Sequence, residues 1–236
     1  MFFHRSPRRC RGPGKPAPTR LNACALCACQ AGVPQSGFVS FDDTSPILVA
    51  GLGNPGPRYE TTRHNIGFLA ADELAGAAAP MPGHFALDKR AQALTCDIRV
   101  GNRKVIVAKP QTYMNLSGGP VSSLCRFFKI PAGNVIVIHD ELDLDFGVIR
   151  LKKGGGDNGH NGLKDITKAL GTRDYLRVRC GIGRPPGRMA PADWVLKPFT
   201  GDQGRQLGIV TADISDAVEL LITQGLAIAQ NQVHAD

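Results

Sequence analysis

The chain of 236 residues is 42% hydrophobic and 20% charged, which is typical of one globular domain or of a domain with a tail. Its formal net charge of +8 favours a polyanionic partner, although charge bears on association and not on fold. No stretch approaches the roughly 18 apolar residues that a membrane-spanning helix needs. The seven cysteines form an odd, unpatterned set, which argues against a disulfide framework and for a reducing compartment.

Residues 1–45 differ in composition from the rest of the chain. They contain six Arg or Lys residues and no acid ahead of residue 42, with recurrent Pro and Gly and no hydrophobic period, so we predict a disordered basic tail. The cluster Cys24-x-x-Cys27-x-Cys29 suggests a metal ion, but no second ligand pair at zinc-finger spacing follows it. An Arg-rich, acid-poor transit peptide and a mis-assigned start near Val39 are alternatives for this segment.

The folded domain is expected to span residues 46–236, with strands and helices in alternation. The predicted strands are residues 47–50, 95–100, 104–108, 135–138, 148–151 and 176–182, and the predicted helices are residues 65–76, 120–128, 161–170 and 213–229. This alternation indicates an α/β fold, a three-layer sandwich with helices on both faces of a twisted, mostly parallel sheet. A hairpin around Gly101-Asn102 makes the sheet mixed.

A glycine motif, GLGNPG at residues 51–56, follows the first predicted strand. It matches the GxGxxG fingerprint of dinucleotide-binding proteins, and Asp72 lies about 20 residues further on, as that fingerprint requires. Pro55 and Pro57, however, lack the backbone N–H groups that would meet a pyrophosphate. Asp72 also falls in a helical pattern instead of at the end of a second strand. An NAD(P)-binding oxidoreductase is therefore one alternative function.

A histidine and a carboxylate stand where chemistry is expected. His64 lies at a loop-to-helix junction, and imidazole titrates near neutrality, as a general base must; a surface imidazole at a helix start is the alternative. Asp140 follows the predicted strand 135–138, at the sheet edge where ligands gather in open α/β folds. A carboxylate there can fix the tautomer of a histidine. Asp143 and Asp145, on alternate positions, can instead chelate Mg²⁺ or belong to a solvated acidic turn.

Side-chain amides and basic residues complete the pattern. Asn115 follows another strand end, where its amide can hold a peptide carbonyl or an oxyanion, although Asn before Ser-Gly is also ordinary in turns. Between Arg150 and Arg188, ten Lys or Arg residues accompany three acids, a density that suits phosphate contact or a solvated basic face. Those around the glycine-rich loop are Lys152, Lys153, Lys164, Lys168, Arg177 and Arg179. Since no Ser or Cys nucleophile motif occurs, this combination predicts attack of water on an activated ester.

From about Pro46 to its end, the chain resembles the bacterial-type peptidyl-tRNA hydrolases. Five motifs carry the resemblance: GLGNPG at 51–56, TRHN at 62–65, YMNLSG at 113–118, HDELD at 139–143 and GHNGLK at 159–164, and GIGRP at 181–185 also fits. The resemblance implies a monomeric, cytoplasmic enzyme of translation that cleaves the ester between a peptide and the terminal ribose of tRNA, recycling the tRNA. It implies no metal or other cofactor, and contacts with the acceptor end and phosphate backbone of peptidyl-tRNA.

The resemblance also assigns roles to individual residues. His64 corresponds to the general base and Asp140 to the carboxylate that orients it. Asn54, Asn115 and Asn161 correspond to the amides that position the peptide, the ester carbonyl and the water.

The remaining implied site residues contact the tRNA. Tyr59 matches a residue near the cleaved end, and Lys152 and Arg179 align with basic residues that meet tRNA phosphates. The chain departs from the family pattern at Asp157-Asn158 in the glycine-rich loop, and at 144–147, where prolines are common. A non-catalytic RNA-binding module is the second alternative function.

Overall fold

The computed structural model describes residues 41–235, so the predictions for the cysteine cluster, the transit peptide and the alternative start lie outside the described residues. The strands are β1 (Ile47–Gly51), β2 (Ala86–Asp88), β3 (Ala93–Val100), β4 (Arg103–Pro110), β5 (Val135–Glu141), β6 (Ile149–Lys153) and β7 (Leu176–Gly181). The helices are α1 (Ile66–Gly76), α2 (Gly118–Phe128), α3 (Asn161–Leu170), α4 (Pro191–Val195), α5 (Gly201–Gln224) and α6 (Leu226–Val233). Short 3₁₀ turns are η1 (Pro57–Tyr59), η2 (Arg63–Asn65), η3 (Met114–Leu116) and η4 (Ala132–Asn134).

The seven strands form one mixed sheet in the order β2-β3-β4-β1-β5-β7-β6. The four central strands β4, β1, β5 and β7 are mutually parallel, while β2, β3 and β6 pair antiparallel toward the edges. The turn at Gly101 closes the predicted hairpin between β3 and β4. The predicted α/β sandwich with a mixed sheet is thereby confirmed.

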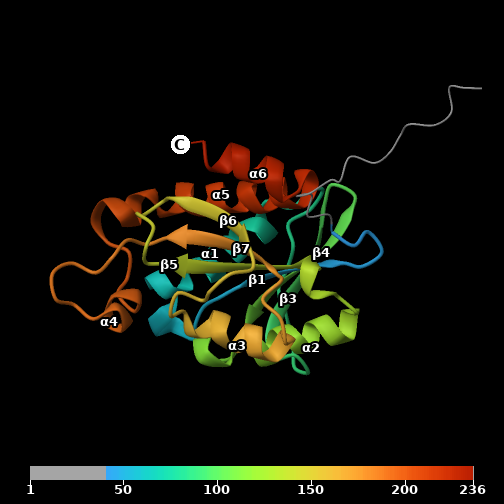
Figure 1. Cartoon of the computed structure of the whole chain (residues 1–236), viewed down its shortest axis with the longest axis horizontal. Coiled ribbons are helices and arrows are strands. Elements are labelled where there is room, and N and C mark those ends of the chain that lie inside the picture. The colour runs from blue at the N-terminus through green and yellow to red at the C-terminus, as the bar shows by residue number, and fades with distance from the viewer. Residues whose placement is uncertain (1–40, 236) are drawn as a thin grey trace, which may run out of the picture. The chain divides into compact units, whose positions relative to one another are not determined.

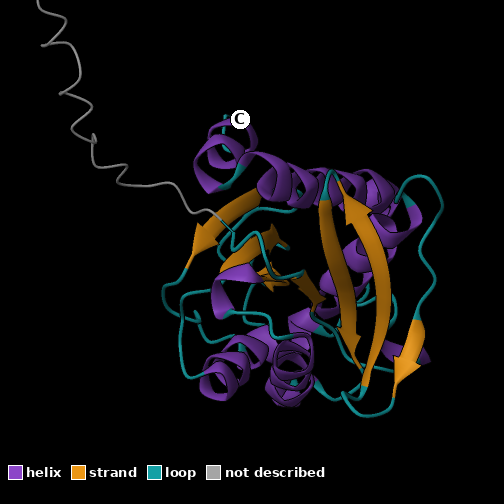
Figure 2. Cartoon of the chain, turned by 90° about the vertical axis from the view of Figure 1, so that its right-hand side faces the viewer, coloured by secondary structure: helices purple, strands orange, loops and turns teal. Residues whose placement is uncertain are grey.

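Helices cover both faces of the sheet (Figures 1 and 2). The central strand β1 is buried along its whole length, so its alternate residues feed two separate cores. Ile47 and Val49 pack in the core shared with α1 and α5. Leu48 and Ala50 pack in the other core, shared with α2 and α3. Because the parallel strands end at one edge of the sheet, the loops that follow β1, β4 and β5 come together there.

Two predicted elements differ from the structure by more than two residues at one end. Strand β5 runs to Glu141 and is buried throughout, so His139, Asp140 and Glu141 are its last residues; sheet pairing with β7 holds all three. The predicted helix at 213–229 is instead two helices, because Gly225 adopts a φ of 79° between α5 and α6. No helix in the described part of the chain is long and apolar enough to cross a membrane.

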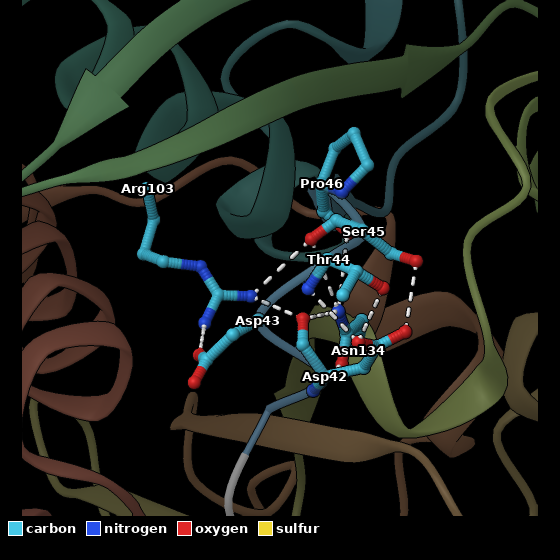
Figure 3. Close-up of polar contacts among 7 residues, drawn as sticks. All are labelled: Asp42, Asp43, Thr44, Ser45, Pro46, Arg103 and Asn134. Atoms are coloured by element: carbon cyan, nitrogen blue, oxygen red, sulfur yellow. Dashed lines mark hydrogen bonds and ion pairs between the residues drawn. The ribbon is translucent and has the colours of Figure 1, made fainter.

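The residues just ahead of β1 form polar contacts with Asn134 of η4 and with Arg103 of β4 (Figure 3). Phe41 is only 8% exposed and belongs to the core beneath α5. The buried Asn134 accepts the N–H of Asp42 at 2.8 Å and donates to the carbonyls of Asp42, Ser45 and Pro46. These contacts join residues 41–45 to the folded part of the chain, and we propose that the domain includes them, ahead of the predicted boundary at residue 46.

Replacing Asn134 by Ala is expected to lower the free energy of unfolding by about 2 kcal/mol, because buried backbone groups lose their partners. Urea denaturation measures this. The matched control is Asn231→Ala on the exposed face of α6, which should stay within about 0.5 kcal/mol of the parent. Equal losses in the two variants would contradict a stabilising role for the Asn134 contacts.

Candidate active site

An open cavity of about 690 Å³ lies where the loops after β1, β4 and β5 meet. Its lining includes five of the eight predicted site residues: Asn54, His64, Asn115, Asp140 and Asn161. Tyr113, Leu142 and the segment around α4 supply an apolar part of the wall. A cavity with an apolar wall and a few convergent polar groups is the expected form of a ligand site.

Two histidines share one carboxylate oxygen at the centre of this cavity. His64 Nδ1 lies 2.8 Å from Asp140 Oδ1, and His160 Nε2 lies 3.0 Å from the same oxygen. His64 comes from η2, just before α1, and His160 is the N-cap of α3. The predicted pairing of His64 with Asp140 is therefore present in the structure. The second histidine was not predicted as a site residue.

The partners of each ring determine its tautomer. His160 Nδ1 accepts the backbone N–H of Leu163 at 3.3 Å, so its Nε2 carries the proton and donates to Asp140. His64 donates from Nδ1 to the carboxylate, which leaves its Nε2 as an unprotonated nitrogen with no partner among the described residues. A neutral imidazole in that tautomer is a general base.

His64 and Asp140 each offset the cost that burial imposes on the charged form of the other. Burial lowers the pKa of His64, but the charge of Asp140 and their hydrogen bond outweigh burial and raise it above the ordinary value of 6.5. Burial likewise raises the pKa of Asp140, while the charges and N–H bonds of His64 and His160 hold it well below the usual range. Asp140 is thus an ionised acceptor for both rings.

A third imidazole, His139, contacts both His160 and the backbone of Asp140. Its ring centroid lies 5.1 Å from that of His160, and it is 2% exposed. Burial, together with the charge of His160, lowers the pKa of His139 to about 3, so this ring stays neutral. Its Nδ1–H donates to the backbone carbonyl of Asp140 at 2.8 Å, which helps to fix the end of β5.

Asn54 is held by its neighbours in one defined orientation. Its Oδ1 accepts the N–H of Met114 at 2.8 Å, so the amide nitrogen must be the atom left to donate into the cavity. Asn65, which is 2% exposed, accepts the N–H of Asn54 and donates to its carbonyl. Sequence reasoning missed Asn65 as a supporting residue, although it is part of the TRHN motif.

Two further amides reach the cavity without such anchoring. Asn115 in η3 and Asn161 at the start of α3 are exposed and line the cavity. Among the described residues, neither side-chain amide has a hydrogen-bond partner. Both can therefore adjust to a bound molecule.

Arginine side chains hold the glycine-rich loop in place. Arg177, predicted as part of a basic surface, is only 2% exposed, and its guanidinium donates to the carbonyls of Gly155 and Gly156. That expectation of a surface position was wrong because Arg177 lies on β7 beneath the loop. Arg179 donates to the buried Glu141 at 3.0 Å, and Asn158 Nδ2 donates to the same oxygen at 3.2 Å.

Three predicted tRNA contacts lie outside the cavity lining. Tyr59 sits in η1, where its hydroxyl contacts Arg58. Lys152 is exposed on the edge strand β6 and lies against Gly155. Arg179 is committed to its ion pair with Glu141, with a side chain 22% exposed.

His64, Asp140 and His160 are also the group among the described residues that can hold a metal ion, with ligand atoms within 4.8 Å of one another. In the observed arrangement His64 Nδ1 and His160 Nε2 are used for hydrogen bonds to Asp140. A metal bound through these two nitrogens would have to replace their protons. Asp143, considered as a Mg²⁺ ligand, instead forms an ion pair with Arg184.

The glycine motif serves packing and not a dinucleotide. A Cβ on Gly51 would come within 2.2 Å of the Gly67 carbonyl, and one on Gly53 within 2.7 Å of the Phe68 ring. Both neighbours belong to α1, which begins only at Ile66. Only the three-residue turn η1 follows the glycines directly, and not the N-terminus of an α-helix, which a pyrophosphate site requires.

Comparisons with known proteins agree with this geometry. The family model for peptidyl-tRNA hydrolase matches residues 48–236. Curated peptidyl-tRNA hydrolases from Rhodococcus erythropolis and Nocardia farcinica are 57% and 56% identical over 191 residues, which is 81% of this chain and 99% and 97% of the relatives. A crystal structure of peptidyl-tRNA hydrolase from Acinetobacter baumannii superposes with a TM-score of 0.73 at 34% identity, covering 80% of this chain and 95% of that one. The chain belongs to the peptidyl-tRNA hydrolase family.

Proposed function

We propose that the chain hydrolyses the ester between a peptide and the terminal ribose of tRNA, with His64 as the general base. The hydrogen bond from His64 Nδ1 to Asp140 Oδ1, at 2.8 Å, carries the proposal. It leaves Nε2 free to take a proton from water, and Asp140 stabilises the imidazolium that results. Family membership supports peptidyl-tRNA as the substrate.

In the reaction that follows from this geometry, water loses a proton to His64 Nε2 and attacks the ester carbonyl. The oxyanion that forms needs a donor, and the amide nitrogen of Asn54 supplies one from a fixed position. When the C–O bond to the ribose breaks, the proton held on His64 passes to the departing ribose oxygen. Asn161 is the proposed partner of the attacking water. The proposed reaction requires no metal or other cofactor.

A free aminoacyl-tRNA lacks the peptide bond next to the ester. An amide that bonds to that peptide group rejects substrates without it, because the site would then bury an unpaired polar group. Asn115 is the proposed reader, since its amide reaches the cavity and has no partner among the described residues.

We propose that exposed lysines around the glycine-rich loop contact the tRNA phosphates. Lys152 and Lys153 on β6 and Lys164 and Lys168 on α3 are all exposed. The proposed role of Arg179 is more indirect, because its pairing with Glu141 ties it to the loop. A monomer acting in the cytoplasm is also proposed, as the family resemblance implies.

Removing the general base tests the chemistry. In His64→Ala, kcat should fall by about 10²–10⁴ while the affinity for tRNA stays near that of the parent. Single-turnover release of N-acetyl-aminoacyl groups from tRNA, with and without EDTA, measures it. Release that survives EDTA argues against a metal-dependent reaction, and a near-normal kcat in the variant would remove His64 from this role.

The pH dependence of kcat/KM tests the proposed roles of His64 and Asp140. Because the base must be neutral and the pKa of His64 is raised, kcat/KM should rise with pH through a midpoint above 6.5. In Asp140→Asn the charge that raises the pKa is gone, so this acidic limb should move to lower pH while kcat drops sharply. An unmoved limb would mean that another group titrates.

Substitutions at the loop separate two kinds of basic residue. Lys152→Ala should raise KM, leave kcat nearly unchanged and reduce the salt dependence of tRNA binding by about one phosphate contact. Arg179→Ala should change both constants, because Glu141 is left buried without its partner. Lys89→Ala, an exposed lysine beside β2 at the opposite sheet edge, is the control and should change neither constant.

A further inference from the structure

The residue before His64 is a buried cation without an acidic partner. Arg63 is 3% exposed, and it forms no ion pair among the described residues. Burial lowers its pKa, yet a guanidinium keeps its charge in proteins. A charge in such a position must be compensated by hydrogen bonds and aromatic contacts.

The side-chain hydrogen bonds of Arg63 go to the segment that follows α4 and to the start of α5. Arg63 Nη1 donates to the carbonyls of Lys197 and Pro198, at 3.1 and 2.6 Å. Its Nη2 donates to Gln203 Oε1 at 2.8 Å. The backbone adds a short antiparallel pairing, in which Arg63 N–H donates to the Lys197 carbonyl and Phe199 N–H donates to the Thr61 carbonyl.

The guanidinium also stacks on an aromatic ring of α4. Arg63 Cζ lies 3.6 Å from the centroid of Trp194, and the indole N–H of Trp194 donates to the Gly183 carbonyl at 2.8 Å. Trp194 is thus held from two sides, by the arginine that precedes His64 and by the loop that follows β7. Helix α4 has only five residues, so these contacts fix its position more than its own backbone can.

The segment that Arg63 holds forms part of the apolar wall of the cavity. Pro191, Ala192, Val195 and Leu196 line it together with His64. Leu196 is 44% exposed, although an apolar side chain gains from being covered. Exposed apolar groups around a polar centre mark a surface that a ligand covers.

We propose that Arg63 is a positioning residue that sets this wall relative to His64, and that the wall accepts an apolar side chain on the amino acid esterified to the tRNA. The proposal rests on the proposed function and adds a substrate preference to it. Arginine suits the task because its planar fork bonds several carbonyls while its face stacks on indole, whereas lysine offers a single point charge.

The test compares hydrolysis of N-acetyl-phenylalanyl and N-acetyl-glycyl esters of one and the same tRNA, so that the two substrates differ only in the amino-acid side chain. The parent should favour the phenylalanyl substrate in kcat/KM. In Arg63→Met, that value should fall about tenfold for the phenylalanyl substrate, the range of an altered apolar contact, and less than twofold for the glycyl substrate. Arg63→Lys should recover part of the loss, and the acidic limb of the pH profile should stay in place.

Trp194→Leu removes the ring that Arg63 stacks on and should reproduce the selective loss. The double variant should be no worse than either single one, since both changes break one shared contact. If circular dichroism shows that Arg63→Met does not fold, the comparison of the two substrates is made with Trp194→Leu alone. Arg90→Met is the matched control. Arg90 also stacks on an aromatic ring, with its Cζ 3.3 Å from the centroid of Phe127, but neither residue lines the cavity.

Equal losses for the two substrates in Arg63→Met and Trp194→Leu would overturn the proposal and leave Arg63 a purely structural residue. A parent enzyme without preference between them would overturn the role of the wall. Cleavage of neither substrate by the parent would refute the proposed function itself, which distinguishes that failure from failure of the positioning role.

Discussion

The candidate active site depends on one carboxylate oxygen, Asp140 Oδ1, to which both His64 and His160 donate a ring N–H. The oxygen can serve two donors because it is ionised and lies at the end of a buried strand whose backbone is paired on one side with β7. A buried carboxylate is costly unless it is paired and hydrogen-bonded. The two rings therefore stabilise the charge, and the charge in turn orients the rings and determines which nitrogen of His64 is left unprotonated.

The end of β5 also organises the surroundings of this pair. Successive strand residues point to opposite faces of a sheet, so Asp140 and its neighbour Glu141 serve different groups. Asp140 binds the histidines, whereas Glu141 accepts from Arg179 and from Asn158 of the glycine-rich loop. The departure from the family pattern at Asn158 thus has a structural role in this chain, because its amide joins the loop to the strand that carries Asp140, the proposed partner of the general base.

Local patterns predicted the central strands, the hairpin and the helix that begins at Asn161, because these elements are decided by apolar periodicity and turn residues within short windows. They did not predict α4, which has five residues and no periodicity. Among the functional groups, His64 and Asp140 were found together because strand-end chemistry and family resemblance both point to them. His160, Asn65 and Arg63 were missed as supporting residues, since each acts through a partner that is not adjacent in sequence.

The sequence by itself determined which side chains stand at strand ends and helix starts, since that depends on local backbone preference and on the order of polar and apolar residues. Only the tertiary structure decided which of those groups share a partner. Arg177 and Arg179 look alike in the chain, yet one is buried beneath the glycine-rich loop and the other is paired with Glu141. The physical reason is that the order of strands in the sheet brings distant residues together, and no local pattern encodes that order.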